Sequence, residues 1–369
     1  MTRESASSGG VYRGFRRVSL QGSLFTLCCG GKIHFITRIY QIDSWAALGQ
    51  YVPAMSSSNV ELAELSSSHL PEPVPYAVVT PPGYNDSGPL PLCLVLMGGG
   101  GGRDNLVQCQ PLFDLWGSEG SLAPMVFATP SPGMSYYLED PAHNVRWESF
   151  LVEDFIPHLR ATCNVGNDSR STAITGTSMG GYGALKTAFA HPEAFAAVAA
   201  MNPMIEPGYR DADIGKRNRL HHGAGGPEHF VGPQRDPELF AANQPVNRAR
   251  ANAGRIRASG LAIYLEVGDN DFVNAHDGTE FLHRVLWDLD LSHEYRLTRG
   301  ADHGGPMFRP RMKAAHSWIS EVLTAKPPSE PSPEQKAIDA LRAGMEPVRK
   351  QAALCDPTVR RRFGILPRE

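Results

Sequence analysis

From residue 75 onward, short apolar runs alternate with stretches that favour helices, and turns rich in glycine and proline separate them. This alternation is typical of an α/β domain with a largely parallel sheet. The run LCLVLM at 92–97 is continuously apolar, as expected of a strand that is buried on both faces. We predict strands at 76–80, 92–97, 125–129, 172–175, 196–200, 261–267 and 294–298, and helices at 148–162, 180–190, 278–289, 310–325 and 334–350.

The overall charge excludes several classes of protein. The chain of 369 residues has 35 Lys and Arg against 38 Asp and Glu, a net charge of −3. A balance this even provides no basic field for phosphates, which argues against a dedicated nucleic-acid binder or a protein drawn to anionic lipid. No apolar run approaches the ~20 residues that a membrane-spanning helix needs, so we predict a soluble protein.

The six cysteines indicate a reducing compartment. They include no CxxC pair, and their number is too small for a disulfide scaffold in a chain of this length. We therefore expect mostly reduced thiols and a cytoplasmic location.

The chain divides into three parts by composition. Residues 1–54 contain six basic and only two acidic residues, and three interpretations stay open: a targeting segment, an accessory arm that is disordered, or translation from an upstream start with Met55 as the true one. We place the main domain at 55–325. Within it, 202–260 shows no sustained period and is predicted to be a lid or substrate-binding insertion. Residues 326–369 are predicted to form a proline-rich linker, a helix and a solvated basic tail.

The most informative motif is GTSMGG at 176–181. It follows the predicted strand 172–175 and precedes the predicted helix 180–190. A strand, a sharp turn and a helix are the arrangement that raises a nucleophilic serine, here Ser178, above the sheet. Glycines flank such a turn because a Cβ there would strike the neighbouring strand and helix. A plain glycine-rich helix cap is the alternative interpretation.

Two later loops supply the other groups that a nucleophilic serine needs. A serine hydroxyl is a poor nucleophile at neutral pH, so it requires a histidine base and an acid that orients this base. In this class of fold the order along the chain is serine, acid, histidine. The loop GDNDF at 268–272 follows one predicted strand, and the loop RGADHGG at 299–305 follows the next. Both loops lie at carboxyl ends of strands, where open α/β sheets place their sites.

From these positions we predict Asp271 as the acid and His303 as the base. The alternative acids are Asp269, which is the main rival, Asp277 and Asp302. The remaining histidines form no HExxH or comparable ligand spacing. The neighbours His221 and His222 are interpreted as incidental. We therefore predict neither a metal site nor a cofactor.

Acyl transfer also needs backbone N–H groups that point at the developing oxyanion. One donor is predicted to be Met179, which follows the serine directly. The second is predicted in the run of five glycines at 98–102, with Gly99 and Gly100 as the candidates. A phosphate-binding loop is the alternative for this run, but no G-K-[ST] sequence completes it.

With these motifs, residues 75–325 resemble the "putative esterase" family of α/β hydrolases. This family includes S-formylglutathione hydrolase (esterase D), feruloyl and related carbohydrate esterases, and the mycolyltransferase antigens. The matching pieces are PPGY at 81–84, the glycine run, Trp147 ahead of FIP at 155–157, 176–185, 268–271 and the His303 loop. The resemblance implies an α/β-hydrolase fold, with a mostly parallel central sheet and helices on both faces. It also implies Ser178 as nucleophile, Asp271 as acid and His303 as base.

The chain departs from its nearest subfamilies in two places. S-formylglutathione hydrolases have a Ser-Gly-Leu-Thr-Cys type of segment where this chain has glycines, so that narrow identity is in doubt. The 202–260 stretch matches no subfamily. Tyr136, Tyr137 and Trp147 are predicted to line an acyl or aromatic pocket, with packing in the core as the alternative.

These features predict a serine hydrolase that cleaves a small-molecule carboxylic ester or thioester through an acyl-enzyme intermediate. Two alternatives stay open: an acyltransferase to a sugar or alcohol, and a catalytically silent interaction module. The sequence also leaves open whether the protein is a homodimer.

Overall fold

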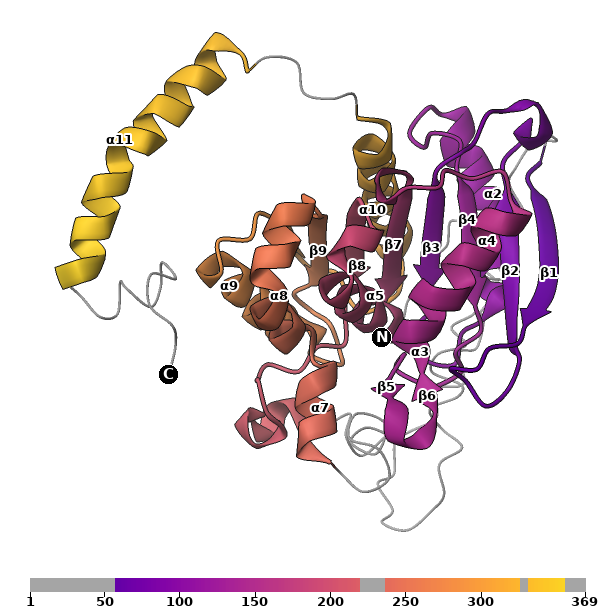
Figure 1. Cartoon of the computed structure of the whole chain (residues 1–369), viewed down its shortest axis with the longest axis horizontal. Coiled ribbons are helices and arrows are strands. Elements are labelled where there is room, and N and C mark those ends of the chain that lie inside the picture. The colour runs from indigo at the N-terminus through magenta and orange to yellow at the C-terminus, as the bar shows by residue number, and fades with distance from the viewer. Residues whose placement is uncertain (1–56, 220–235, 326–330, 356–369) are drawn as a thin grey trace, which may run out of the picture. The chain divides into compact units, whose positions relative to one another are not determined.

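The computed structural model describes residues 57–219, 236–325 and 331–355 (Figure 1). The predicted N-terminal segment 1–54, the pair His221 and His222, and the basic tail lie outside the described residues. So does most of the predicted linker. In the described part of the chain, no helix is both long and apolar enough to cross a membrane.

An eight-stranded, mostly parallel sheet forms the centre of the domain. Its strands are β1 (Asn59–Leu65), β2 (Val74–Thr80), β3 (Leu92–Leu96), β4 (Val126–Pro130), β7 (Thr172–Thr177), β8 (Ala197–Met201), β9 (Ala262–Gly268) and β10 (Glu294–Thr298). Their order in the sheet is β1-β2-β4-β3-β7-β8-β9-β10. Strand β2 is antiparallel to both of its neighbours, and all pairs from β4 to β10 are parallel. This is the predicted α/β-hydrolase fold.

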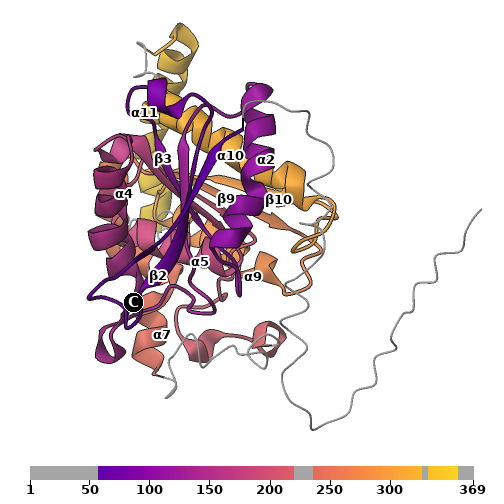
Figure 2. The same ribbon diagram turned by 90° about the vertical axis from the view of Figure 1, so that its right-hand side faces the viewer.

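Helices cover both faces of this sheet (Figure 2). They are α2 (Arg103–Ser118), α3 (Trp147–Ser149), which continues through a π-helical segment (Phe150–Phe155) into α4 (Ile156–Thr162), α5 (Met179–Ala190), α7 (Pro237–Asn243), α8 (Pro245–Ser259), α9 (Ala275–Asp288) and α10 (Phe308–Thr324). A further helix, α11 (Pro333–Cys355), contributes none of its described side chains to the core. Short 3-10 turns are Tyr84–Asp86, Pro141–His143, Ser169–Ser171, Pro192–Ala194, Asp211–Asp213 and Lys216–Arg219. A small hairpin pairs β5 (Glu139–Asp140) with β6 (Val145–Arg146).

The sheet separates two apolar cores. Helices α4, α5, α8 and α9 pack on one face, and α2 and α10 pack on the other. Strand β3 shows how the sequence provides for both, because Leu92, Leu94 and Leu96 point to the first core while Cys93 and Val95 point to the second. Burying one such leucine contributes about 1.5–3 kcal/mol. The continuous apolar run therefore holds helices on both sides of the strand.

The stretch 202–260 shows no sustained period in the sequence, yet its second half is helical, and its role as a lid or substrate-binding insertion stays a prediction. Residues 237–243 and 245–259 form α7 and α8, and α8 buries Val246, Ala249 and Ile256 against the rest of the first core. The sequence of α8 gives little periodic apolar signal, because few of its residues are buried and the others are mostly Arg, Asn and Ala. Residues 220–235 of the predicted insertion lie outside the described residues.

Helix α2 and strand β1 were not predicted either. In α2 the buried residues Leu106, Cys109, Phe113 and Trp116 recur at helical spacing, so the signal was present, although Pro111 interrupts it. Strand β1 pairs only with β2, at the edge of the sheet, and most of its side chains are exposed. A weakly apolar edge strand gives little periodic signal.

Candidate active site

Ser178 lies at the sharp turn between β7 and α5. Its φ of 59° and ψ of −122° are unusual for a residue with a Cβ, and such a conformation costs about 1–3 kcal/mol. The surrounding backbone holds it there. The N–H of Ser178 donates to the carbonyl of Met201 at 3.0 Å, and its own carbonyl accepts from the N–H groups of Tyr182 and Met204 at 3.0 and 3.1 Å. Three backbone hydrogen bonds thus stabilise Ser178 in this strained conformation.

Glycines allow the neighbouring segments to approach this turn. A Cβ on Gly180 would lie 1.9 Å from the carbonyl oxygen of Leu96 in β3, and a Cβ on Gly176 would lie 2.3 Å from the carbonyl carbon of Gly180. Both distances are far below contact, so side chains at these two positions are excluded. The role predicted for the flanking glycines is confirmed.

We expect Gly180→Ala to lower the free energy of unfolding by about 1–3 kcal/mol or more, because β3 and α5 must separate to admit the methyl group. Denaturant unfolding measures the effect. Gly254→Ala in α8 is the matched control, since a Cβ there meets nothing within 4 Å and alanine favours the helix by about 0.5–1 kcal/mol. An unchanged unfolding midpoint for Gly180→Ala would show that the close approach is not required.

The structure brings Ser178, His303 and Asp271 together, although they come from three separate loops. The Oγ of Ser178 lies 2.9 Å from Nε2 of His303, and Nδ1 of His303 lies 2.7 Å from Oδ2 of Asp271. All three side chains are buried. An ionised carboxylate can only accept, so Nδ1 carries the imidazole proton and donates it to Asp271. In the neutral ring Nε2 is then free to accept from the serine hydroxyl.

Asp271 is held as a carboxylate. Burial raises its pKa. The hydrogen bond and the charge of His303 lower this pKa, and so do the N–H groups of Ala275 and Val273. The resulting pKa of Asp271 is below the usual value. The two N–H groups donate to Oδ1 at 3.3 and 3.0 Å, which leaves Oδ2 for the imidazole. The charge therefore persists at neutral pH, next to the ring nitrogen that it orients.

The three alternative acids have other partners. Asp269 is exposed and accepts the N–H of Gly300 at 2.6 Å. Oδ1 of Asp302 accepts the backbone N–H groups of Phe272 and His303. Asp277 pairs with Arg217 at 3.3 Å. Asp271 is the carboxylate that the structure places against the imidazole.

The N–H groups predicted to bind the oxyanion differ in their surroundings. Met179 is the first residue of α5, so its N–H belongs to the unpaired N-terminal turn of a helix. The glycine run passes close by, because a Cβ on Gly98 would lie 3.5 Å from the Cβ of Ser178. The N–H of Gly100 donates to the carbonyl of Gly133 at 3.2 Å, and this hydrogen bond argues against Gly100 as the donor. Gly99 stays a prediction as the second donor.

The predicted pocket aromatics are mostly core residues. Tyr137 is fully buried, its hydroxyl donates to the carbonyl of Met97 at 3.1 Å, and its ring packs edge-on against Trp147. Trp147 also packs edge-on against Phe150, so these contacts favour the alternative of packing in the core for Tyr137 and Trp147. Tyr136 remains a candidate, since its N–H donates to the sulfur of Met179 at 3.3 Å.

Sequence reasoning missed an aromatic side chain beside the base. Phe272 follows the acid directly, its ring centre lies 5.6 Å from that of His303, and it is 53% exposed. An aromatic side chain in the acid loop was visible in the motif GDNDF, but its exposure was not. Met307, which is 39% exposed, lies in the same loop as His303, just before α10.

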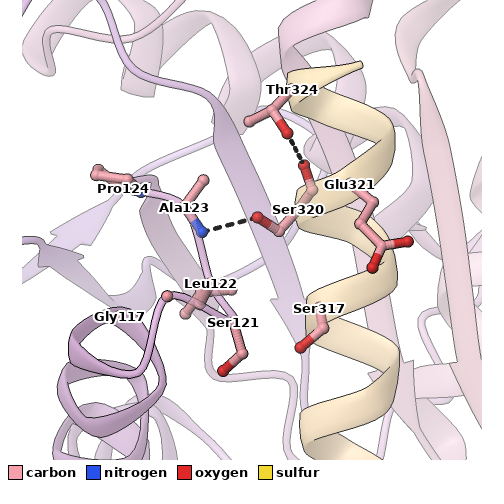
Figure 3. A pocket seen from close by; sticks show the side chains of 10 residues that line it. Gly117, Ser121, Leu122, Ala123, Pro124, Ser317, Ser320, Glu321 and Thr324 are labelled. Atoms are coloured by element: carbon pink, nitrogen blue, oxygen red, sulfur yellow. Dashed lines mark hydrogen bonds between the residues drawn. The ribbon is translucent and has the colours of Figure 1, made fainter.

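A surface pocket of about 460 Å³ lies elsewhere in the fold (Figure 3). It is formed by the segment that precedes β4 and by the second half of α10, where the hydroxyl of Ser320 accepts the N–H of Ala123 at 2.7 Å. The pocket therefore lies at the amino end of β4, whereas Ser178 follows the carboxyl end of the parallel strand β7. Among the described residues, no group of three or more His, Cys, Asp or Glu side chains is arranged to bind a metal ion.

The sequence matches one family model and several curated proteins. Residues 67–319, more than half of the chain, match the family model described as "Putative esterase". The chain is 25% identical over 210 residues to "Diacylglycerol acyltransferase/mycolyltransferase Ag85A" of Mycobacterium tuberculosis (strain ATCC 25618 / H37Rv), a match that covers 51% of this chain and 59% of that protein. It is 24% identical over 204 residues to "Acetyl esterase" of Caldicellulosiruptor saccharolyticus, with 52% of this chain and 71% of that protein covered.

Solved structures share the fold. A ferulic acid esterase superposes with a TM-score of 0.59 at 19% identity, over 73% of this chain and all of that one. An S-formylglutathione hydrolase from Agrobacterium tumefaciens gives a TM-score of 0.57 at 17% identity, over 74% of this chain and 99% of that one. These similarities establish the α/β-hydrolase architecture.

Proposed function

Because the chain belongs to the "putative esterase" family, we propose that it is a serine hydrolase that cleaves a carboxylic ester or thioester through an acyl-enzyme intermediate. The observation that carries this proposal is the continuous hydrogen-bonded series from the Ser178 hydroxyl through His303 to Asp271, at 2.9 and 2.7 Å. Nucleophile, base and orienting acid are all within the reach that this chemistry needs.

Acylation begins at the serine. Oγ of Ser178 attacks the carbonyl carbon of the substrate while Nε2 of His303 takes the hydroxyl proton, and the carbonyl π electrons move to the oxygen. The imidazolium that forms is stabilised by the adjacent charge of Asp271, which does not itself become protonated. The negative oxygen is bound by the N–H of Met179 and, in this proposal, by that of Gly99. Each such donor contributes about 10²- to 10³-fold to kcat.

The tetrahedral adduct then collapses. Its bond to the leaving oxygen or sulfur breaks as Nε2 of His303 returns the proton to that atom, and the acyl group remains on Oγ of Ser178. Water attacks the acyl carbon while Nε2 of His303 takes a proton from the water. The bond between the acyl carbon and Oγ of Ser178 then breaks as Nε2 returns the proton to Oγ, and the carboxylic acid is released. One base therefore serves both halves of the reaction, and Phe272 beside it is placed to contact the leaving group or the incoming water.

A burst experiment tests the proposal. With p-nitrophenyl acetate in excess, we expect rapid release of about one equivalent of p-nitrophenol per enzyme, followed by a slower steady rate, because this activated ester acylates the serine faster than water removes the acetyl group. Intact-protein mass spectrometry of acid-quenched samples is expected to find one acetyl group on the enzyme. Turnover without any acyl-enzyme would contradict the covalent route.

The similarity to a mycolyltransferase favours acyl transfer as a second candidate function. The two functions differ only in what attacks the acyl-enzyme. Adding a sugar or a primary alcohol to the assay distinguishes them, because a transferase diverts the acyl group into a new ester at the expense of the free acid. A series of ester chain lengths, with a thioester and a feruloyl ester included, defines the acyl and leaving groups.

The described cysteines support our proposal of a reducing, cytoplasmic location. Cys93, Cys109 and Cys163 are free thiols. Burial raises the pKa of the Cys109 thiol to about 12 and the pKa of the Cys93 thiol further. These two side chains are core residues rather than nucleophiles.

A further inference from the structure

A buried ion pair lies between β9 and α10, next to the loops that carry the acid and the base. Arg311 on α10 is 5% exposed and Glu266 on β9 is 1% exposed. The guanidinium binds the carboxylate in bidentate fashion, with Nε donating to Oε1 at 2.7 Å and one terminal nitrogen donating to Oε2 at 2.8 Å. Oε1 also accepts the hydroxyl of Thr298 at 2.7 Å. The carboxylate is thus tied to β10 as well.

The other donors of Arg311 point to the base. Its second terminal nitrogen donates to the carbonyl of Asp302 at 2.7 Å. The first one also donates to the side-chain oxygen of Asn202. The side-chain nitrogen of Asn202 in turn donates to the carbonyl of His303 at 2.9 Å. The backbone carbonyl groups of Asp302 and His303, which are consecutive in the base loop, therefore both accept hydrogen bonds from buried side chains.

Asn202 is fixed in an unusual conformation. It is fully buried just after β8 and has a φ of 41°, in the left-handed region that asparagine tolerates better than most residues. Its N–H donates to the carbonyl of Glu266 at 2.7 Å, and its side-chain oxygen accepts the N–H of Gly268 at 3.2 Å. The ends of β8 and β9 and the base loop all meet at this one side chain.

Stability alone does not account for such a pair. Replacing a buried ion pair by apolar residues is often neutral or stabilising, by about 1–4 kcal/mol, because the desolvation of two charges offsets their attraction. What apolar residues cannot supply is the set of directed hydrogen bonds to Asp302 and His303. The side chain of His303 needs such support, since a displacement of about 1 Å in a reacting group can cost about 10²-fold in rate.

We propose that Arg311, Glu266 and Asn202 form a positioning clamp that fixes the backbone of His303, so that its Nε2 faces the hydroxyl of Ser178. None of the three touches the reacting atoms, so they are positioning residues. The inference rests on the proposed function, in which His303 is the base.

Two variants test the clamp. Arg311→Lys keeps a positive charge near Glu266 but cannot bind Glu266, Asn202 and Asp302 at once. The double variant Glu266→Leu with Arg311→Met removes both charges together. We expect kcat to fall about 10- to 100-fold in both, with KM within about twofold, because a displaced base slows the chemical step rather than substrate binding. The double variant is expected to keep a denaturation midpoint close to that of the wild type.

The control is Arg255→Met, which breaks an exposed ion pair outside the active site, in which one terminal nitrogen of Arg255 donates to both carboxylate oxygens of Glu193. It is expected to leave kcat unchanged. If the double variant is folded and turns over at the wild-type rate, the clamp is refuted while the proposed function stands.

A spectroscopic readout is independent of turnover. In protein labelled with ¹⁵N-histidine, the Nδ1 proton of His303 that Asp271 accepts is expected to give a resonance at low field. We expect this resonance to shift or broaden in both clamp variants and to be unchanged in Arg255→Met. An unchanged resonance in the clamp variants would overturn the positioning role. A shift in these variants together with a wild-type protein that hydrolyses no ester would keep the clamp and refute the proposed function.

Discussion

Replacing Ser178 by alanine is expected to lower kcat for p-nitrophenyl acetate by about 10⁶-fold, the scale of losing the nucleophile of a serine hydrolase. The fold is expected to persist, because alanine keeps the Cβ and the hydroxyl has His303 as its hydrogen-bond partner in the structure. The three backbone hydrogen bonds that hold the strained turn also remain. Steady-state kinetics and circular dichroism on the same sample measure both effects.

The control for this variant is Ser118→Ala. Ser118 is an exposed residue at the end of α2, and its hydroxyl donates only to the carbonyl of Leu115. It is expected to turn over like the wild type. Hydrolysis by Ser178→Ala at more than about 1% of the wild-type rate would place the nucleophile elsewhere, since the residual rate without a triad is far lower.

The second large effect is expected for Asp271→Asn, with a fall in kcat of about 10⁴-fold. An asparagine can present its N–H₂ group to Nδ1 of His303, and the imidazole then carries its proton on Nε2, where it cannot accept from Ser178. The variant also loses the negative charge that stabilises the imidazolium. The rate of p-nitrophenyl acetate hydrolysis at neutral pH measures the loss.

Asp269→Asn is the matched control, because Asp269 lies in the same loop as Asp271, accepts the backbone N–H of Gly300 and does not contact the imidazole. It is expected to retain most of the activity. A normal rate for Asp271→Asn combined with a large loss for Asp269→Asn would reverse the assignment of the acid.

Asp271 also makes stability depend on pH. Its pKa in the folded protein is lowered, so its contribution to stability is present above the unfolded-state pKa of about 3.9 and is lost as the pH falls through the folded-state pKa. The asparagine variant has no such titration. The difference in unfolding free energy between wild type and Asp271→Asn is therefore expected to change below about pH 4 and to be constant near neutrality.

The central part of the fold was predictable because its determinants are local. The continuous apolar run of β3 predicts a buried strand, and the glycine-rich turn after β7 predicts where β7 ends and α5 begins. Parallel strands bring their carboxyl ends to one edge, so the sequence alone predicts that the loops after β9 and β10 lie near Ser178. That geometric rule, rather than any property of an isolated aspartate, separated Asp271 from most other carboxylates.

What the sequence could not provide depends on contacts between distant segments. The N–H of Gly100 is occupied because the loop around Gly133 crosses it, and nothing in a run of five glycines distinguishes one N–H from the next. Tyr137 is as apolar and aromatic as a pocket residue, yet its ring fills the space left by Gly183. Asn202 and Arg311 are 109 residues apart, and only folding brings them to the base loop.

Peptide mapping after reaction with a fluorophosphonate probe identifies the activated serine of this protein. Such probes react with a serine hydroxyl that an adjacent base has activated, so labelling of Ser178 requires His303 to act as its base. We expect a single phosphonylated peptide with the modification on Ser178, and none in Ser178→Ala. Labelling at another serine, or no labelling of a folded and pure wild-type protein, would contradict the proposed function.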